Sequence, residues 1–521
     1  MQSRRMDYSK KTIWLIGITV IVKLALSFLL ELGNDEVYYY TYAVQPDWNH
    51  FDHPPMVGWM IQMSTLNLHW VSTLSMRLGS ILAAAISTWI VFNTGTILHS
   101  ARAGWIASLF YTLSIYTSII AGLFIMPDSP QLLFFTGSIY LMVKWVRKPQ
   151  LFTVMNWLGL GCLIGLATLS KVHGLYLWAG FGAFILFHQV KTLKQPYLYL
   201  AVGITICLIL PIVYWNIDND FITYKFHSKR VLHSGIQLDS LVQQMVGELL
   251  YQNPLVYISC LIPFIRFKQL KSVFQNASSS ISVLYLLLWL SLPLIFLFWT
   301  ISLFNPTLPH WTGPGYIALF LIAGVYWAEK SNLLFPKITQ WAIGFFGLLV
   351  VGFVLLVHVF PKQLGSTAAE NLGEYNPIND VTGWTQFSAE FSQLVERDVK
   401  LNVMTDRSPI IASKWFPAGH ILFYTARPLH KQVIAIGGLE DVHKFAWLNQ
   451  TQPSLQIGQD AYFIQPSNLP FDPTTLVLPY FEKQGATDTI QVIKKGVLLR
   501  SFYIYRFKHC KKIPSPILPK K

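Results

Sequence analysis

Long apolar stretches dominate the first 360 residues of the chain. Eleven of them approach or exceed the length of about 20 residues that crosses the hydrocarbon core of a membrane. They lie near residues 12–30, 72–98, 103–122, 130–146, 153–171, 174–190, 197–215, 254–265, 281–302, 314–328 and 340–360. Because one run is short and two others have almost no polar separator, the pattern predicts eleven to thirteen membrane helices.

The pattern changes after residue 360, where the apolar runs stop. The segments SPIIASKWF, HKQVIAIGG and VLLRSFYIYRF look like strands, and WTQFSAEFSQLVERDVK has the apolar spacing of a helix. We therefore predict a predominantly α polytopic membrane domain over residues 1–360 and a small external α/β domain over 361–521. Within the first domain, residues 31–71 form the first external loop and are expected to contain amphipathic helices.

Composition and charge support a membrane protein and set its orientation. The chain is 53% hydrophobic and 12% charged, against roughly 25% charged in soluble domains. Lysines and arginines fill one alternating set of loops, whereas residues 31–71 contain none. The positive-inside rule then places the N-terminus in the cytoplasm and both residues 31–71 and the C-terminal domain outside. The net charge of +14 is largely explained by these loops, so no nucleic-acid partner is expected.

Ionisable residues gather at the predicted external face. Such groups are costly near a membrane and suggest function. The first of them are Asp35 and Glu36 in ELGNDEVYYYTYAVQPDWNHFDHPPM, directly after the first apolar run. The others come from five further segments and are Arg77, Asp128, Lys171, Lys225, Lys229, Arg230, His233 and His310.

Each of these residues also has a structural explanation. Asp35 and Glu36 could cap an external helix, and Asp128 could cap the helix that follows it. Lys171 could extend from a helix end towards the interface, and His310 could anchor an aromatic belt. The residues alone leave these alternatives open.

The combination of carboxylates and cations favours glycosyl transfer from a lipid phosphate. A carboxylate can accept the proton of an attacking acceptor, while cations neutralise a departing phosphate. A divalent metal could bind here but is not required, and no nucleotide-binding motif is present. The alternative is a secondary transporter or flippase for a lipid-linked or anionic substrate. Transporters usually place such groups at mid-membrane and contain a repeat, and neither is evident here.

Four motifs resemble one family. NDEVYYYTYAVQPDWNHFDHPPMVGWM is similar to the first external loop of GT-C membrane glycosyltransferases of the glycosyltransferase family 39, aminoarabinose-transferase and protein O-mannosyltransferase type. MPDSPQLLFF resembles their second acidic motif, GLATLSKVHGL their lysine segment and LPHWTGPGY their Pro-His segment. The motifs follow in the same order along the chain.

The resemblance implies a polyprenyl-phosphate sugar as donor, inversion at the anomeric carbon and a location in the bacterial inner membrane. It implies Asp35 as general base, with Glu36 beside it, and Asp128 as a second acidic catalytic residue. The substrate-binding residues that it implies are Lys171, Arg230 and His310 at the phosphate, Tyr38 and Trp48 stacking on sugar, and His53. The sugar stays open, as does the acceptor, which could be a lipid, a glycan or a protein.

Overall fold

The computed structural model describes residues 7–229, 235–276 and 281–518. Contacts divide the chain into two compact units. The first comprises Met1–Leu26, Asp47–Ser64 and Arg77–Leu349, and the second comprises Ser27–Pro46, Thr65–Met76 and Val350–Lys521. Two parts of the predicted first external loop, residues 31–46 and 65–71, therefore belong to the same unit as the C-terminal residues.

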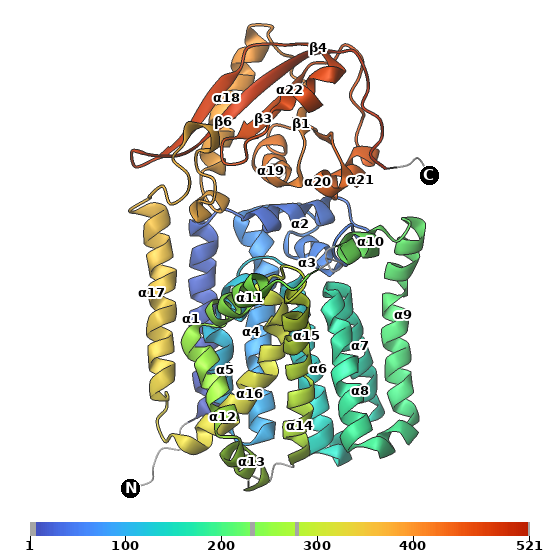
Figure 1. Ribbon diagram of the computed structural model, residues 1–521, viewed down its shortest axis with the longest axis vertical. Helices are drawn as coiled ribbons and strands as arrows, with labels where there is room; N and C mark the ends of the chain where they lie inside the picture. Colours follow the sequence, from blue (N-terminus) through green and yellow to red (C-terminus); the bar gives the residue numbers. More distant parts are fainter. Residues whose placement is uncertain (1–6, 230–234, 277–280, 519–521) are drawn as a thin grey trace. The chain divides into compact units, whose positions relative to one another are not determined.

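All eleven predicted apolar segments are helical (Figure 1). The corresponding helices are α1 (Tyr8–Leu29), α4 (Thr73–Leu98), α5 (Ala101–Leu113), α6 (Asp128–Arg147), α7 (Val154–Ser170), α8 (Tyr176–His188), α9 (Pro196–Asp218), α12 (Pro254–Ile265), α14 (Ile281–Trp289), α15 (Leu292–Ser302), α16 (Gly313–Lys330) and α17 (Lys337–His358). The segment over 281–302 contains two helices, and Pro293 is the second residue of α15, in the first turn, where the missing N–H of proline costs nothing.

Five helical segments among the described residues are long and apolar enough to cross a membrane. They are Tyr8–Leu29, Thr73–Leu98, Pro196–Asp218, Ile281–Ser302 and Lys337–His358. Shorter apolar helices cover Val154–Ser170, Val172–His188 and Pro254–Ile265. The predominantly α fold is confirmed, while eleven to thirteen membrane crossings stay a prediction.

Small residues bring α4, α5 and α16 close together in the first unit. A Cβ atom on Gly104 would lie 2.2 Å from the carbonyl oxygen of Phe92, and one on Gly324 would lie 2.8 Å from that of Ala103. Such close approach is typical of helix packing in membranes, where dispersion contacts replace the hydrophobic effect between helices. These helices lead directly into the segments that carry Tyr116 and His310.

Several helices do not come from long apolar runs. The first external loop contains α2 (Asn34–Val44) and α3 (Met56–Ser64), as expected for that loop. Three others were not predicted: α10 (Ile222–Lys229), α11 (Leu238–Tyr251) and α13 (Phe267–Asn276). Polar residues interrupt their apolar faces, so a search for continuous apolar runs passes over them.

The second unit contains a mixed sheet in the strand order β2-β1-β3-β6-β4, with β5 also paired to β6. Its strands are β1 (Ile410–Ala412), β2 (Val433–Ala435), β3 (Ala461–Pro466), β4 (Phe481–Gln484), β5 (Asp488–Lys494) and β6 (Val497–Cys510). The first three strands are parallel, whereas β6 is antiparallel to β3, β4 and β5. The predicted small α/β domain is confirmed, with strands where three were expected and α18 over Trp384–Lys400.

A buried ion pair joins α18 to this sheet. Arg506 on β6 donates from Nε and Nη2 to the two carboxylate oxygens of Asp398, at 2.6 and 3.0 Å. The hydroxyl of Tyr462 on β3 donates to the same carboxylate at 3.1 Å. Because Asp398 and Arg506 are both buried, these bonds offset the cost of removing two charges from water.

Candidate active site

Asp128 and Lys171 form a buried ion pair in the first unit. Asp128 begins α6, and Lys171 directly follows the last residue of α7. The Lys171 ammonium lies 3.0 Å from Oδ1 and 2.9 Å from Oδ2 of Asp128, and the side chains are 4% and 1% exposed. Lys171 therefore does not extend towards the interface, and Asp128 is a helical residue rather than the cap before α6.

The hydroxyl of Tyr116 also holds Asp128, donating to Oδ1 at 2.7 Å. Tyr116 begins a π-helical turn, Tyr116–Ile120, after α5. A buried pair needs such additional hydrogen bonds to compensate for desolvation. An ammonium carries three N–H donors, and the two Asp128 oxygens engage two of them. Among the residues that the structure describes, no hydrogen bond engages the third, which could meet an anionic ligand.

His310 lies beside the same tyrosine. It belongs to a short 3₁₀ turn, Pro309–Thr312, before α16. Its ring is roughly parallel to those of Tyr116 and Tyr251, with centroids 6.4 and 6.1 Å away. Burial, together with the charge of Lys171, lowers the pKa of His310 to about 4, although the charge of Asp128 opposes the shift. His310 is therefore neutral at pH 7 and offers a hydrogen bond rather than a positive charge.

His53 belongs to the same electrostatic group. It lies in the FDHPP turn, with Nε2 at 4.0 Å from the carboxylate of Asp52. Burial lowers its pKa to about 4, and the charges of Asp52, Lys171 and Asp128 also act on it. Nearby, Nε2 of His227 contacts the carbonyl oxygen of Asp52 at 2.9 Å. The turn is thus part of the surroundings of the ion pair.

Trp48 is exposed on the first unit. Its side chain is 59% exposed, and its ring meets that of Trp59 edge to face at 6.1 Å. The position is compatible with the stacking role expected from the sequence, which stays a prediction.

A polar network supports the turn that carries His310. Glu248 on α11 is fully buried and accepts hydrogen bonds from Nε1 of Trp299, at 2.7 Å, and from the hydroxyl of Tyr316. A Cβ atom on Gly247 would lie 2.3 Å from Pro309, so α11 packs directly against this turn. The packing of α11 against Pro309 and the hydrogen bond from Tyr316 on α16 to Glu248 together fix the position of the turn that carries His310.

The second unit contains the pair Asp35 and Glu36, and the structure distinguishes the two. Glu36 is buried, and its Oε2 accepts a hydrogen bond from the backbone N–H of the N-cap residue Gly33 at 2.9 Å, which satisfies one free donor at the start of α2. Asp35, at the second helical position, is exposed. The capping interpretation thus describes Glu36, while Asp35 is an exposed residue.

Tyr38 follows on the buried side of α2. Its ring centroid lies 5.1 Å from that of Trp415 and 5.8 Å from that of His443, and the residue is 2% exposed. Protein contacts therefore occupy this ring, whereas a stacking role on sugar stays a prediction. Arg230, expected at the donor phosphate, lies outside the described residues.

Sequence reasoning missed Tyr116, His173 and Glu248. His173 is two residues from Lys171 in the quoted LSKVHG motif, and the charges of Lys171 and Asp128 act on it, so that signal was present. Tyr116 lies in an apolar run, and Glu248 lies on an unpredicted helix. Neither carried a sequence signal.

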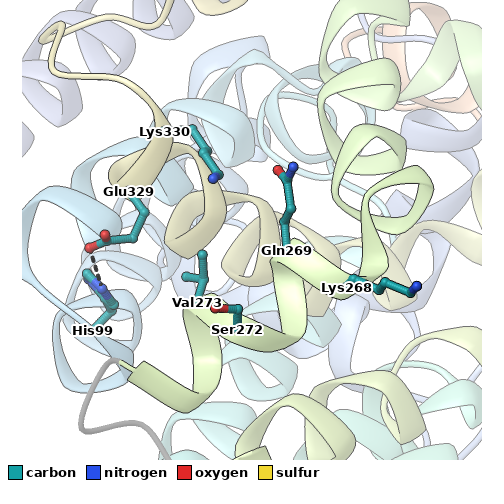
Figure 2. Close-up of a pocket in the computed structure, with 7 residues that line it drawn as sticks. All are labelled: His99, Lys268, Gln269, Ser272, Val273, Glu329 and Lys330. Carbon is teal, nitrogen blue, oxygen red and sulfur yellow. Dashed lines mark ion pairs between the residues drawn. The ribbon is translucent and has the colours of Figure 1, made fainter.

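A separate cavity of about 500 Å³ lies at the other end of α16 (Figure 2). It is lined by His99, Lys268, Gln269, Ser272, Val273, Glu329 and Lys330. His99 and Glu329 form an ion pair at 2.9 Å. His99 and Lys330 lie at helix C-termini, where positive charge complements the helix dipole. Since α16 has 18 residues, about 27 Å at 1.5 Å per residue, this cavity is not part of the Asp128 site.

Comparisons with known proteins support the predicted family. A family profile described as dolichyl-phosphate-mannose-protein mannosyltransferase matches residues 52–215. The chain is 22% identical over 429 residues to lipid A galacturonosyltransferase RgtD of Rhizobium johnstonii, covering 81% of this chain and 83% of that protein. Both matches support the predicted GT-C membrane glycosyltransferase family.

Solved structures agree with this fold. ArnT from Cupriavidus metallidurans in the apo state matches with a TM-score of 0.63 and 14% identity, over 95% of this chain and 98% of that one. The same protein bound to undecaprenyl phosphate matches with a TM-score of 0.60, 14% identity and coverage of 95% and 97%. The predicted family and enzyme class are confirmed, and the protein is an integral membrane protein. The transferase interpretation thereby replaces the transporter alternative.

Proposed function

We propose that this glycosyltransferase transfers a sugar from a polyprenyl-phosphate donor to a lipid acceptor, with inversion at the anomeric carbon. The observation that carries the proposal is the buried Asp128–Lys171 pair, which holds an ammonium close to His53 and His310. A phosphate oxygen is the ligand that such a group suits. The ArnT relative bound to undecaprenyl phosphate supports the same donor class.

The reaction would proceed in one displacement. The acceptor oxygen attacks the anomeric carbon from the face opposite the phosphate, and Asp35 accepts its proton. The bond between the anomeric carbon and the phosphate oxygen breaks, and its electron pair leaves with the polyprenyl phosphate. Lys171 balances the growing negative charge, and His310, with Arg230, binds the phosphate.

Asp35 suits the role of base better than Glu36. Asp35 is an exposed residue, whereas Glu36 is buried and its carboxylate caps α2. A general base must reach the proton that it removes. Glu36 then supports the site by fixing the first turn of the helix that carries Asp35.

The proposed identities of the acceptor and the sugar rest on the relative RgtD and not on residues of the site. RgtD is named for transferring galacturonic acid to lipid A, which makes a lipid A-type glycolipid the first acceptor to test and a uronic acid the first sugar. No metal is needed in this scheme, because Lys171 supplies the positive charge. The orientation predicted from the loops puts the chemistry on the periplasmic side of a bacterial inner membrane.

The decisive experiment uses the purified full chain in detergent. It would be incubated with lipid A and polyprenyl phosphates that carry galacturonic acid, a neutral hexose or an aminopentose. We expect release of polyprenyl phosphate with one donor, together with the matching mass increase of lipid A. Release without modified lipid A would overturn the acceptor, and no release with any of the three would overturn the donor class.

A further inference from the structure

The helix that carries Asp35 is built into the second unit by contacts on both sides of its first turn. Glu31 precedes α2, and its carboxylate accepts hydrogen bonds from the backbone N–H groups of Trp384 and Thr385 at 2.8 and 3.0 Å. Those groups begin α18, whose preceding residue is a glycine without a capping side chain. Glu31 therefore caps α18, and this bond fixes the chain just before Asp35.

A second contact fixes the residue next to Asp35. Nε2 of His420 lies 2.9 Å from Oδ1 of Asn34. Since an amide oxygen only accepts, His420 must carry its proton on Nε2. The ring is fully buried and stacks on Trp384, with centroids 4.1 Å apart and planes at 5°. The amide of Asn34 also hydrogen-bonds Asp380.

The third contact is a close backbone approach. α2 lies against α19 (Trp415–His420), as Figure 1 shows. A Cβ atom on Gly419 would lie 3.0 Å from Cγ2 of Val37 and 3.2 Å from the backbone nitrogen of Tyr38. Both distances are shorter than ordinary contacts, so even a methyl group at Gly419 would push α2 away by a few tenths of an ångström.

We propose that Asn34, His420 and Gly419 are positioning residues that hold Asp35 in register for proton transfer. The C-terminal unit would then set the rate of the chemical step. This inference rests on the proposed role of Asp35 as general base. Side chains that act on reacting atoms must be held closely, and a misplacement of about 1 Å can cost about a hundredfold in rate.

The test compares turnover with donor affinity in the full chain. Gly419→Ala and Asn34→Ala should each lower kcat by about tenfold, while KM for the polyprenyl-phosphate sugar stays within about twofold, because the donor contacts are elsewhere. His420→Ala should behave in the same way. His420→Gln can still donate to Asn34 and should recover part of the lost turnover.

Two matched controls separate positioning from folding. Asn449 makes two backbone hydrogen bonds to Ala435 and, like Asn34, is half-buried. A Cβ atom on Gly485 would meet its nearest atoms at an ordinary 3.6 Å. Asn449→Ala should lower thermal stability without lowering kcat, and Gly485→Ala should change neither.

The outcomes also separate this inference from the proposed function. If Gly419→Ala and Asn34→Ala keep full kcat while Asp35→Asn is inactive, the positioning role is wrong and Asp35 remains the base. If Asp35→Asn keeps full turnover, the proposed base is wrong, and the positioning role is overturned with it. Equal losses in the variants and in the two controls would show a structural effect only.

Discussion

The ammonium of Lys171 is held between both carboxylate oxygens of Asp128, at 2.9 and 3.0 Å. Asp128 is the first residue of α6 and Lys171 follows the last residue of α7, and these two helices pack against each other. Because the pair is buried, neither charge has water to stabilise it, and each depends on the other. The pair therefore holds the Lys171 side chain in a fixed position in the absence of a ligand.

Replacing Lys171 should weaken donor binding. The lost contact to the phosphate is charge-assisted and desolvated, so Lys171→Met should cost about 2–3 kcal/mol, or roughly 30- to 150-fold in Kd. Titration with undecaprenyl phosphate would measure the change. Lys144 lies in the last turn of α6, the helix that begins at Asp128, and Lys144→Met should leave Kd unchanged. An unaltered Kd in Lys171→Met would remove Lys171 from the phosphate site.

Asp128→Asn should destabilise the protein more than removal of both charges. The single change leaves the Lys171 ammonium buried without a counter-charge, which typically costs 3–5 kcal/mol. The double variant Asp128→Asn/Lys171→Met should recover part of that loss. The thermal midpoint of each variant in detergent measures this directly, and additive losses in the double variant would contradict a strong pairing.

Asp35 and Glu36 should respond differently to neutralisation. Asp35→Asn should lower turnover by about a hundredfold or more, the usual scale for a general base, with little change in stability because Asp35 is exposed. Glu36→Ala removes the hydrogen bond from the Gly33 N–H and should cost about 1 kcal/mol of stability. Turnover and thermal midpoint, measured on both variants, test the division. The reverse result would make Glu36 the base.

The sequence predicted the helices and part of the sheet for clear physical reasons. Membrane helices require long apolar runs, and every such run is helical in the structure. The strands of Ile410–Ala412 and Val433–Ala435 and the long strand of Val497–Cys510 are rich in β-branched and aromatic residues. In contrast, α11 buries Glu248 and Gln244 on one face, so its pattern does not resemble a buried helix.

The sequence could indicate individual residues of the site, but it could not predict which of them contact each other. Asp128 and Lys171 stood out because each is an isolated charge next to an apolar helix. Their pairing depends on how α6 packs against α7, which no local pattern encodes. Asn34 and His420 are separated by 386 residues, so their contact comes only from the tertiary structure.

Turnover should not depend on a divalent metal. In the proposed site the positive charge comes from Lys171, and the phosphate leaves already ionised. Dialysis against EDTA should therefore leave kcat within about twofold, whereas loss of a catalytic metal removes several kcal/mol of transition-state stabilisation. Loss of activity on dialysis, restored by added metal, would contradict this expectation.

His420 should make the stability of the second unit depend on pH. Burial, together with the charge of Arg500, lowers the pKa of His420 well below 6.5. Above pH 6.5 the side chain is neutral in both the folded and the unfolded chain, so it gives no pH dependence. Below pH 6.5 the unfolded chain binds a proton that the folded chain does not, and stability falls by up to about 1.4 kcal/mol per pH unit.

The thermal midpoint between pH 7.5 and 5.5 would measure this effect. His420→Gln cannot titrate but keeps a donor for Asn34, so its midpoint should fall less steeply than that of the native chain. Other buried histidines contribute the same slope to both proteins and cancel in the comparison. His430→Gln, at an exposed position, should retain the native slope. Equal slopes for the native chain and His420→Gln would show that His420 is not held neutral in the folded state.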